Sequence, residues 1–147
     1  MIKTFVILLV LIALINIESF GQKNHKQEFK ILTLGETPLF MDTDTLRDAS
    51  LNEKDISRLD ELTDKCIQKW NEKIPVKYID GYRGDRKSEE YFIQYLAAYN
   101  KSGEKIVWVN FLRKKDVKEL PDKLVIITDS QFYYNCWINL NQSKIIN

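Results

Sequence analysis

The segment YFIQYLAAYNKSGEKIVWVNFLR, residues 91–113, decides the fold, because two apolar runs rich in aromatic residues flank a short polar stretch. That polar stretch, Asn100-Lys101-Ser102-Gly103, has the residue types of a tight turn. The segment therefore predicts a β-hairpin. The rest of the chain is interpreted as a cover or an extension of this hairpin.

Alternation along the second run of the hairpin predicts which side of the sheet is buried. Successive residues of a strand point to opposite faces. Val107, Val109 and Phe111 form a wholly apolar set, whereas the other set contains Trp108 and Asn110. We expect the apolar set to lie under a helix.

The chain before the hairpin predicts one long helix over residues 51–74. Ser50 and Glu53 have the spacing of a capping box, and Pro75 ends the pattern. Apolar residues recur at spacings of three and four, as on the buried side of an amphipathic helix. This stripe comprises Ile56, Leu59, Leu62, Cys66, Ile67, Trp70 and Ile74.

Further strands are predicted at Phe29 to Leu34, at residues 124–128 (LVIIT) and at Phe132 to Leu140, with a short extended piece at residues 76–82. The short connections favour antiparallel neighbours. These elements predict a single α+β domain over residues 31–147. We expect one long helix on a curved four- to five-stranded antiparallel sheet of cystatin-like or nuclear-transport-factor-like shape.

The N-terminus predicts export. Lys3 precedes an unbroken apolar run from Phe5 to Ile15, which is shorter than the roughly 20 residues that a membrane-spanning helix needs. Small residues at Ser19 and Gly21 suit cleavage before Gln22. Residues 1–21 are therefore interpreted as a signal peptide, and residues 22–30 as a flexible polar tail. The mature protein is expected to be periplasmic or secreted, without stable membrane insertion.

Charge and motifs exclude several classes of function. The 22 basic and 21 acidic residues leave a net charge of +1, so nucleic acid is not an expected partner. The single histidine, His25, lies in the polar tail, which removes the usual catalytic triads, and no phosphate-binding loop or cysteine–histidine cluster is present. We expect no cofactor and no enzyme activity. The alternative from another class is a small metal-assisted hydrolase that uses Asp42 and Asp44.

The face of the sheet opposite the helix predicts a binding surface. It would carry amphipathic aromatic residues mixed with asparagine, as contact surfaces do. We therefore expect a non-catalytic binding module for a peptide, a glycan or a partner protein. The competing interpretation is that residues 29–41 cover this face, and a structural subunit of an envelope assembly is a further alternative. The expected surface comprises Trp108, Asn110, Tyr133, Asn135, Trp137 and Tyr99.

The two cysteines lie on the predicted buried sides of the helix and of the last predicted strand. Cys66 belongs to the apolar stripe of the helix, and Cys136 to the inward set of residues 132–140. Export permits a disulfide between them. Two buried free thiols are the other possibility that the sequence leaves open.

Residues 51–144 resemble a group of small exported bacterial proteins of unknown function. The resemblance lies in the helix LNEKDISRLDELTDKCIQKWNE, the pattern N-x-x-G-x-K-x-V-W-V-N from Asn100 to Asn110, and the segment LVIITDSQFYYNCWINLNQSK. That group often has a cysteine where this chain has Phe111-Leu112, and a Gly-Gly where it has Tyr133-Tyr134. The resemblance implies export and this domain class, and it weakens the expectation of a disulfide.

Overall fold

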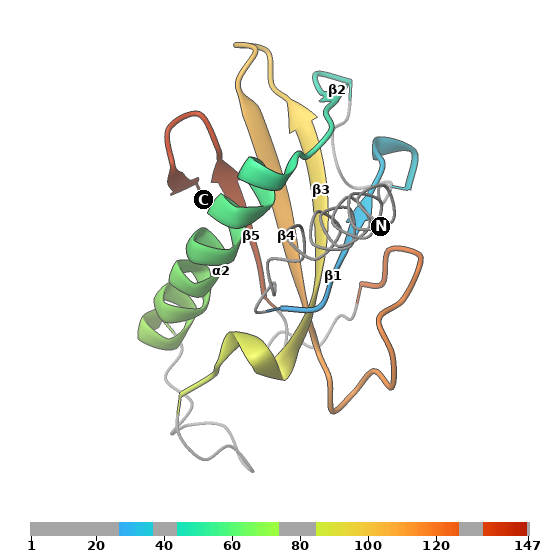
Figure 1. Cartoon of the computed structure of the whole chain (residues 1–147), viewed down its shortest axis with the longest axis vertical. Helices are drawn as coiled ribbons and strands as arrows, with labels where there is room; N and C mark the ends of the chain where they lie inside the picture. The colour runs from blue at the N-terminus through green and yellow to red at the C-terminus, as the bar shows by residue number, and fades with distance from the viewer. Residues whose placement is uncertain (1–26, 37–43, 74–84, 127–133, 147) are drawn as a thin grey trace, which may run out of the picture.

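A computed structural model of the chain describes residues 27–36, 44–73, 85–126 and 134–146 (Figure 1). The predicted signal peptide and the predicted extended piece at residues 76–82 lie outside the described residues. His25, Asp42 and Tyr133 do so as well.

Within the described residues there are one α-helix, α2, and six strands, which form one sheet (Figure 1). The order across the sheet is β1-β3-β4-β5-β6, and β2 pairs with the same edge of β3 as β1. Only β1 runs parallel to its neighbour. The predicted α+β class with a mostly antiparallel sheet is confirmed. The strands are β1 (Phe29–Leu32), β2 (Arg47–Asp48), β3 (Tyr91–Tyr99), β4 (Lys105–Arg113), β5 (Tyr134–Asn139) and β6 (Lys144–Ile146), with short 3-10 helices η1 (Leu34–Glu36) and η3 (Ser88–Glu90).

The predicted hairpin is formed by β3 and β4. The Gly103 amide donates to the Asn100 carbonyl oxygen at 2.9 Å, and the Asn100 amide donates to the Glu104 carbonyl oxygen at 3.0 Å. Gly103 has a φ of 75°, a conformation that favours glycine. This turn sets Tyr99 opposite Lys105 and so fixes the register between β3 and β4.

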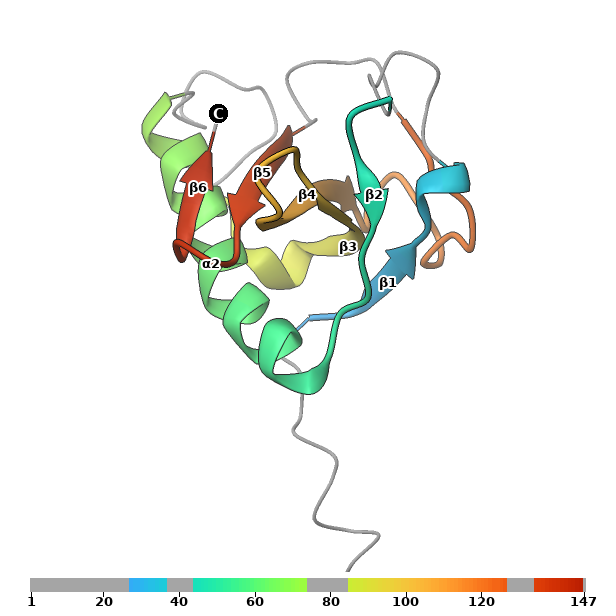
Figure 2. The same cartoon turned by 90° about the horizontal axis from the view of Figure 1, so that it is seen from above.

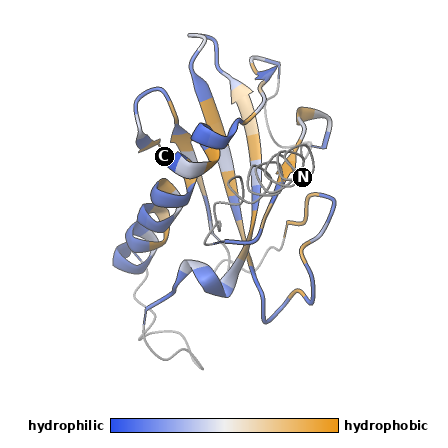
Figure 3. Ribbon diagram, viewed as in Figure 1, coloured by the Kyte–Doolittle hydropathy of each residue, from blue (hydrophilic) through white to orange (hydrophobic). Residues whose placement is uncertain are grey.

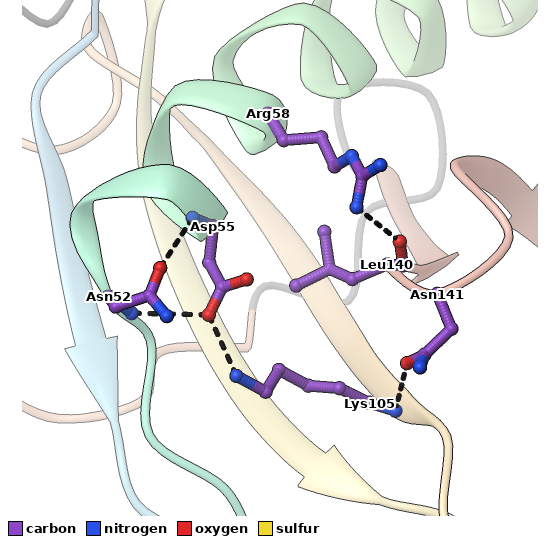
Figure 4. A network of polar contacts seen from close by, with 6 residues as sticks. All are labelled: Asn52, Asp55, Arg58, Lys105, Leu140 and Asn141. Carbon is purple, nitrogen blue, oxygen red and sulfur yellow. Dashed lines mark hydrogen bonds and ion pairs between the residues drawn. The ribbon is translucent and has the colours of Figure 1, made fainter.

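Helix α2 (Glu53–Lys73) begins two residues later than the predicted start at residue 51. The Asn52 side-chain oxygen accepts from the Asp55 amide at 2.9 Å, and an Asp55 carboxylate oxygen accepts from the Asn52 amide at 3.2 Å (Figure 4). The cap at Ser50 and Glu53 is therefore wrong. Asn52 and Asp55 offer the same spacing and equally good capping chemistry.

The helix covers the face of the sheet that the sequence predicted. Val107, Val109 and Phe111 are completely buried and belong to one apolar cluster with the helix stripe. Figure 2 shows α2 on one side of the sheet, and Figure 3 shows its hydrophilic residues turned away from the strands. Trp70, near the C-terminal end of α2, belongs to this cluster, and its ring is stacked on that of Tyr134 with 4.9 Å between the ring centres.

Cys66 of α2 and Cys136 of β5 form a disulfide. Both residues are buried at the helix–sheet interface, where alternation had placed them. Of the two possibilities that the sequence left open, the structure contains the bridge.

The predicted N-terminal tail is too long. Gln27 is buried, and its amide nitrogen donates to an Asp64 carboxylate oxygen at 3.2 Å. The Ile93 amide donates to the Glu28 carbonyl oxygen at 3.0 Å, which is the first bond of the parallel β1–β3 pairing. The polar composition of residues 22–30 conceals this pairing, because a polar edge strand needs only backbone groups to join a sheet.

A partly buried ion pair joins the start of α2 to the start of β4. Lys105 Nζ lies 2.7 Å from Asp55 Oδ2, and both side chains are less than one-fifth exposed (Figure 4). Burial raises the pKa of Asp55. The hydrogen bond from Lys105, the Asn52 amide and the nearby positive charges outweigh this effect and lower the pKa below its usual 3.8.

The Asp55 pair predicts a pH-dependent stability. A lowered pKa in the folded state means that the carboxylate stabilises the fold above pH 3.8 and that this contribution is lost as the pH falls through the folded-state pKa. We expect Asp55→Asn to cost about 1–2 kcal/mol at pH 7 and less at pH 2. Urea unfolding at both pH values checks this, with exposed Glu61→Gln as the control. An equal loss for Asp55→Asn at both pH values would contradict it.

Candidate functional site

The predicted binding face is largely a second layer of the core. Trp108 is 3% exposed and packs with Leu32 and Leu96, and Asn110 is completely buried. Trp108 and Asn110 therefore do not belong to an open surface, and their prediction as surface residues is wrong. Leu32 and Leu34 contribute to this layer, so the competing interpretation that residues 29–41 cover the face holds for its described part.

The second cover over this face is the segment from Pro121 to Ile126, here called the strap. The prediction of a strand at residues 124–128 is wrong for its described part, because residues 124–126 are not in a strand. Leu124 packs against the cluster of Trp108 instead. Both views place the orange chain that includes the strap on the β1 side of the sheet (Figures 1 and 2).

Two buried amides hold the strap. Asn110 Nδ2 donates to Gln94 Oε1 at 3.0 Å and to the Val125 carbonyl oxygen at 2.9 Å. Gln94 Nε2 donates to the Lys123 carbonyl oxygen at 2.8 Å, and Gln94 Oε1 accepts from the Val125 amide at 3.3 Å. These side chains provide the pairing that a neighbouring strand would otherwise give the strap backbone.

Removing the Asn110 amide is expected to loosen the strap. Asn110→Ala leaves buried acceptors on Gln94 and Val125 without this donor, which costs about 1–3 kcal/mol. Urea unfolding and hydrogen exchange of the Val125 amide measure the effect. Asn135→Ala is the matched control, since Asn135 lies opposite Asn110 in register but is exposed. If both variants are equally stable, the Asn110 side chain does not hold the strap.

Tyr99 lies on the helix side of the sheet, not with Trp108. The register pairs Tyr99 with Lys105, and Lys105 has the same orientation as the helix-facing Val107. The half-buried ring has the Arg47 guanidinium carbon at 5.8 Å and Lys105 Nζ at 6.0 Å from its centre. The prediction that Tyr99 joins the opposite face is therefore wrong. The face on which the Tyr99 side chain lies depends on how the turn aligns β3 with β4, and the sequence alone left that alignment open.

Asn135 and Trp137 are the two described members of the predicted surface that lie on the face away from α2 and remain accessible, Asn135 exposed and Trp137 half-buried. Both line a hollow of about 660 Å³ between the last turns of α2 and the edge of β5, here called the edge hollow. Its lining comprises Lys69, Glu72, Lys73, Tyr134, Asn135, Cys136, Trp137 and Ile146.

The edge hollow faces the edge of β5 and not one of its faces. Its lining includes four consecutive strand residues, 134–137, whose side chains alternate between the two faces. β6 pairs only with Trp137, Ile138 and Asn139. Within the described residues, Tyr134, Asn135 and Cys136 have no strand partner on the side away from β4.

Hydrogen-bond parity identifies the backbone groups that point into this edge. The Leu140 backbone amide donates to the Lys105 carbonyl oxygen at 2.9 Å, so the backbone N–H of Leu140 points towards β4. The direction of the backbone N–H and C=O groups alternates from residue to residue along an antiparallel strand. These groups of Cys136 and Tyr134 therefore also point towards β4, whereas those of Asn135 point away from it. The Asn135 N–H and C=O are therefore directed to the unpaired edge. The same parity directs Ile93 of β3 away from β4, in agreement with its bond to Glu28.

Positive charge dominates the helix side of the edge hollow. Lys69 and Lys73 are exposed, lie one turn apart on α2, and flank the lining with Glu72 as the one carboxylate. Neither lysine forms an ion pair within the described residues, whereas Lys65 pairs with Glu61 at 2.6 Å. The sequence analysis missed these lysines, although their places beside Cys66 and Trp70 on the helix were the signal for them.

Of the acidic pair Asp42 and Asp44, the structure describes Asp44 alone. Asp44 is exposed in a turn before β2, and Asp42 lies outside the described residues. Across residues 27–36, 44–73, 85–126 and 134–146, no group of three or more histidine, cysteine or acidic side chains is arranged to hold a metal ion. The same residues include no helix with the length and apolar character required to cross a membrane.

No protein-family model, curated protein or solved structure matches this chain. The resemblance to small exported bacterial proteins stays a prediction.

Proposed function

We propose that this protein is an exported, non-catalytic binding module that takes an extended polypeptide segment as an added strand beside β5. The single observation that carries the proposal is the Asn135 backbone, whose N–H and C=O point into the edge hollow beyond the end of β6. An unpaired strand edge binds an extended chain through main-chain hydrogen bonds, and side-chain pockets then select its sequence.

The surroundings of Asn135 support a peptide over a glycan. A sugar-binding platform needs exposed aromatic faces, and the two aromatic residues that line the edge hollow, Tyr134 and Trp137, are both half-buried. A cystatin-like or nuclear-transport-factor-like shape belongs to the same proposal, and the single helix lying across the sheet supports it (Figure 2). Export rests on the predicted signal sequence of residues 1–21.

The test uses the mature chain, residues 22–147, and a blocked tripeptide of glutamine, valine and glutamine, whose valine lies opposite Asn135 and which avoids the place that Ile146 takes opposite Trp137. Nuclear magnetic resonance titration is expected to shift the amides of Asn135 and Trp137 and to slow exchange of the Asn135 amide. Asn135→Pro removes the donor on the free edge without removing a bond to β4, so it is expected to abolish binding. Asn135→Ala keeps the backbone donor and is expected to retain binding.

A second probe makes the test independent of how well Asn135→Pro folds. The same peptide with an N-methylated valine cannot donate to the Asn135 carbonyl oxygen, so it is expected not to bind the unaltered protein. The proposal fails if the unmethylated peptide leaves the β5 amides unchanged, or if methylation has no effect on its binding.

A further inference from the structure

We infer that the strand accepted beside β5 carries acidic side chains at alternate positions. This inference rests on the proposed function and specifies its ligand. A residue placed opposite Asn135 points to the face away from α2, and its two neighbours then point towards the helix. The helix surface in that direction is the part of the edge hollow lined by Lys69 and Lys73.

The surface of α2 along this edge is mainly polar. Beside β6, the adjoining hollow is lined on the helix side by Leu62, Lys65, Gln68, Lys69 and Glu72, of which Leu62 is buried. Beyond Ile146, the lining of α2 consists of Lys69, Glu72 and Lys73. Side chains that point towards α2 beyond the end of β6 would therefore meet charged groups.

The charge balance favours an acidic segment. Lys69 and Lys73 outnumber Glu72, and Lys144 lines the adjoining hollow together with Lys69. The partial negative charge at the helix C-terminus, about half an elementary charge, is smaller than the positive excess of the lysines. The same excess disfavours a second copy of this chain at the site, because it would bring two lysine-rich helix ends together.

The experiment compares three blocked tripeptides that have valine in the centre and glutamate, glutamine or lysine at the two flanking positions. At low salt we expect affinity to fall in the order glutamate, glutamine, lysine, by about two- to fivefold for each ion pair. The differences are expected to shrink at 1 M salt, where the screening length is about 3 Å. Titrations followed at the Asn135 amide measure all three affinities.

Charge reversal at the helix gives the decisive comparison. The double variant Lys69→Glu/Lys73→Glu is expected to reverse the order, so that the lysine peptide binds most tightly. Exposed Lys54→Glu lies on the same helix away from the edge hollow, and it is expected to keep the original order.

The outcomes separate this inference from the proposed function. Equal affinity for all three peptides, with Asn135→Pro still blocking the glutamine peptide, overturns the acidic preference and leaves strand addition intact. No binding of any peptide at β5 overturns both. Concentration-dependent protection of the Asn135 amide in the protein alone, together with dimers in sedimentation, assigns the edge to a second copy and also overturns both.

Discussion

Replacing Cys66 and Cys136 together by alanine is expected to destabilise the protein by about 4 kcal/mol. The bridge closes a loop with a sequence separation of 70 residues, so it removes much of the conformational freedom of the unfolded chain. It also ties the one described α-helix to β5, which is the strand that carries the proposed binding edge. Urea unfolding of the oxidised protein and of the double variant measures the difference.

Reductant provides the internal control for the disulfide prediction. Reducing the unaltered protein is expected to lower its unfolding midpoint towards that of Cys66→Ala/Cys136→Ala, whereas the double variant is expected to be insensitive to reductant. Coincident unfolding curves of the oxidised protein and the double variant would contradict the prediction. Because Cys136 lines the edge hollow, the reduced protein is also the test of whether this site depends on the bridge.

The elements that sequence analysis predicted correctly are those specified by local periodicity. The stripe from Ile56 to Trp70 repeats at helical spacing, and the segment 91–113 contains its own turn, so neither required knowledge of distant partners. The face of β4 followed in the same way, since Val107, Val109 and Phe111 differ in polarity from their neighbours.

The strap shows why local patterns failed elsewhere. The run LVIIT has the composition of a strand, but in its described part the Val125 backbone bonds to the side chains of Gln94 and Asn110, which come from two other strands. An asparagine in an alternating strand can lie on an exposed face, or it can be buried with its side-chain amide bonded to the backbone of another segment. Only the long-range arrangement decides between them.

The candidate site was predicted in part for the same reason. Asn135 and Trp137 were included because alternation placed them opposite the helix, and both line the edge hollow. The unpaired edge itself depends on where β6 stops relative to β5, and β6 was not predicted. Lys69 and Lys73 were not predicted as site residues, since a helical pattern does not say which strand lies beside the polar side of the helix.

Trp108→Ala is expected to cost about 3–5 kcal/mol in the free energy of unfolding, because it empties the centre of the second apolar layer. Trp108 is 3% exposed and belongs to one apolar cluster with Leu32 of β1 and Leu96 of β3. Its cross-strand partner Trp137 is half-buried, so Trp137→Ala is expected to cost clearly less. Urea unfolding of the two variants under identical conditions gives the comparison.

The pair of tryptophan variants also separates a core layer from a binding face. If Trp108 belongs to the core, its variant loses stability, and at temperatures where it remains folded it still binds the glutamine tripeptide at the β5 edge. If the face under the strap opens to receive a ligand, Trp108→Ala and Trp137→Ala have similar small effects on stability. That result would return Trp108 and Asn110 to the binding surface and move the functional site away from Asn135.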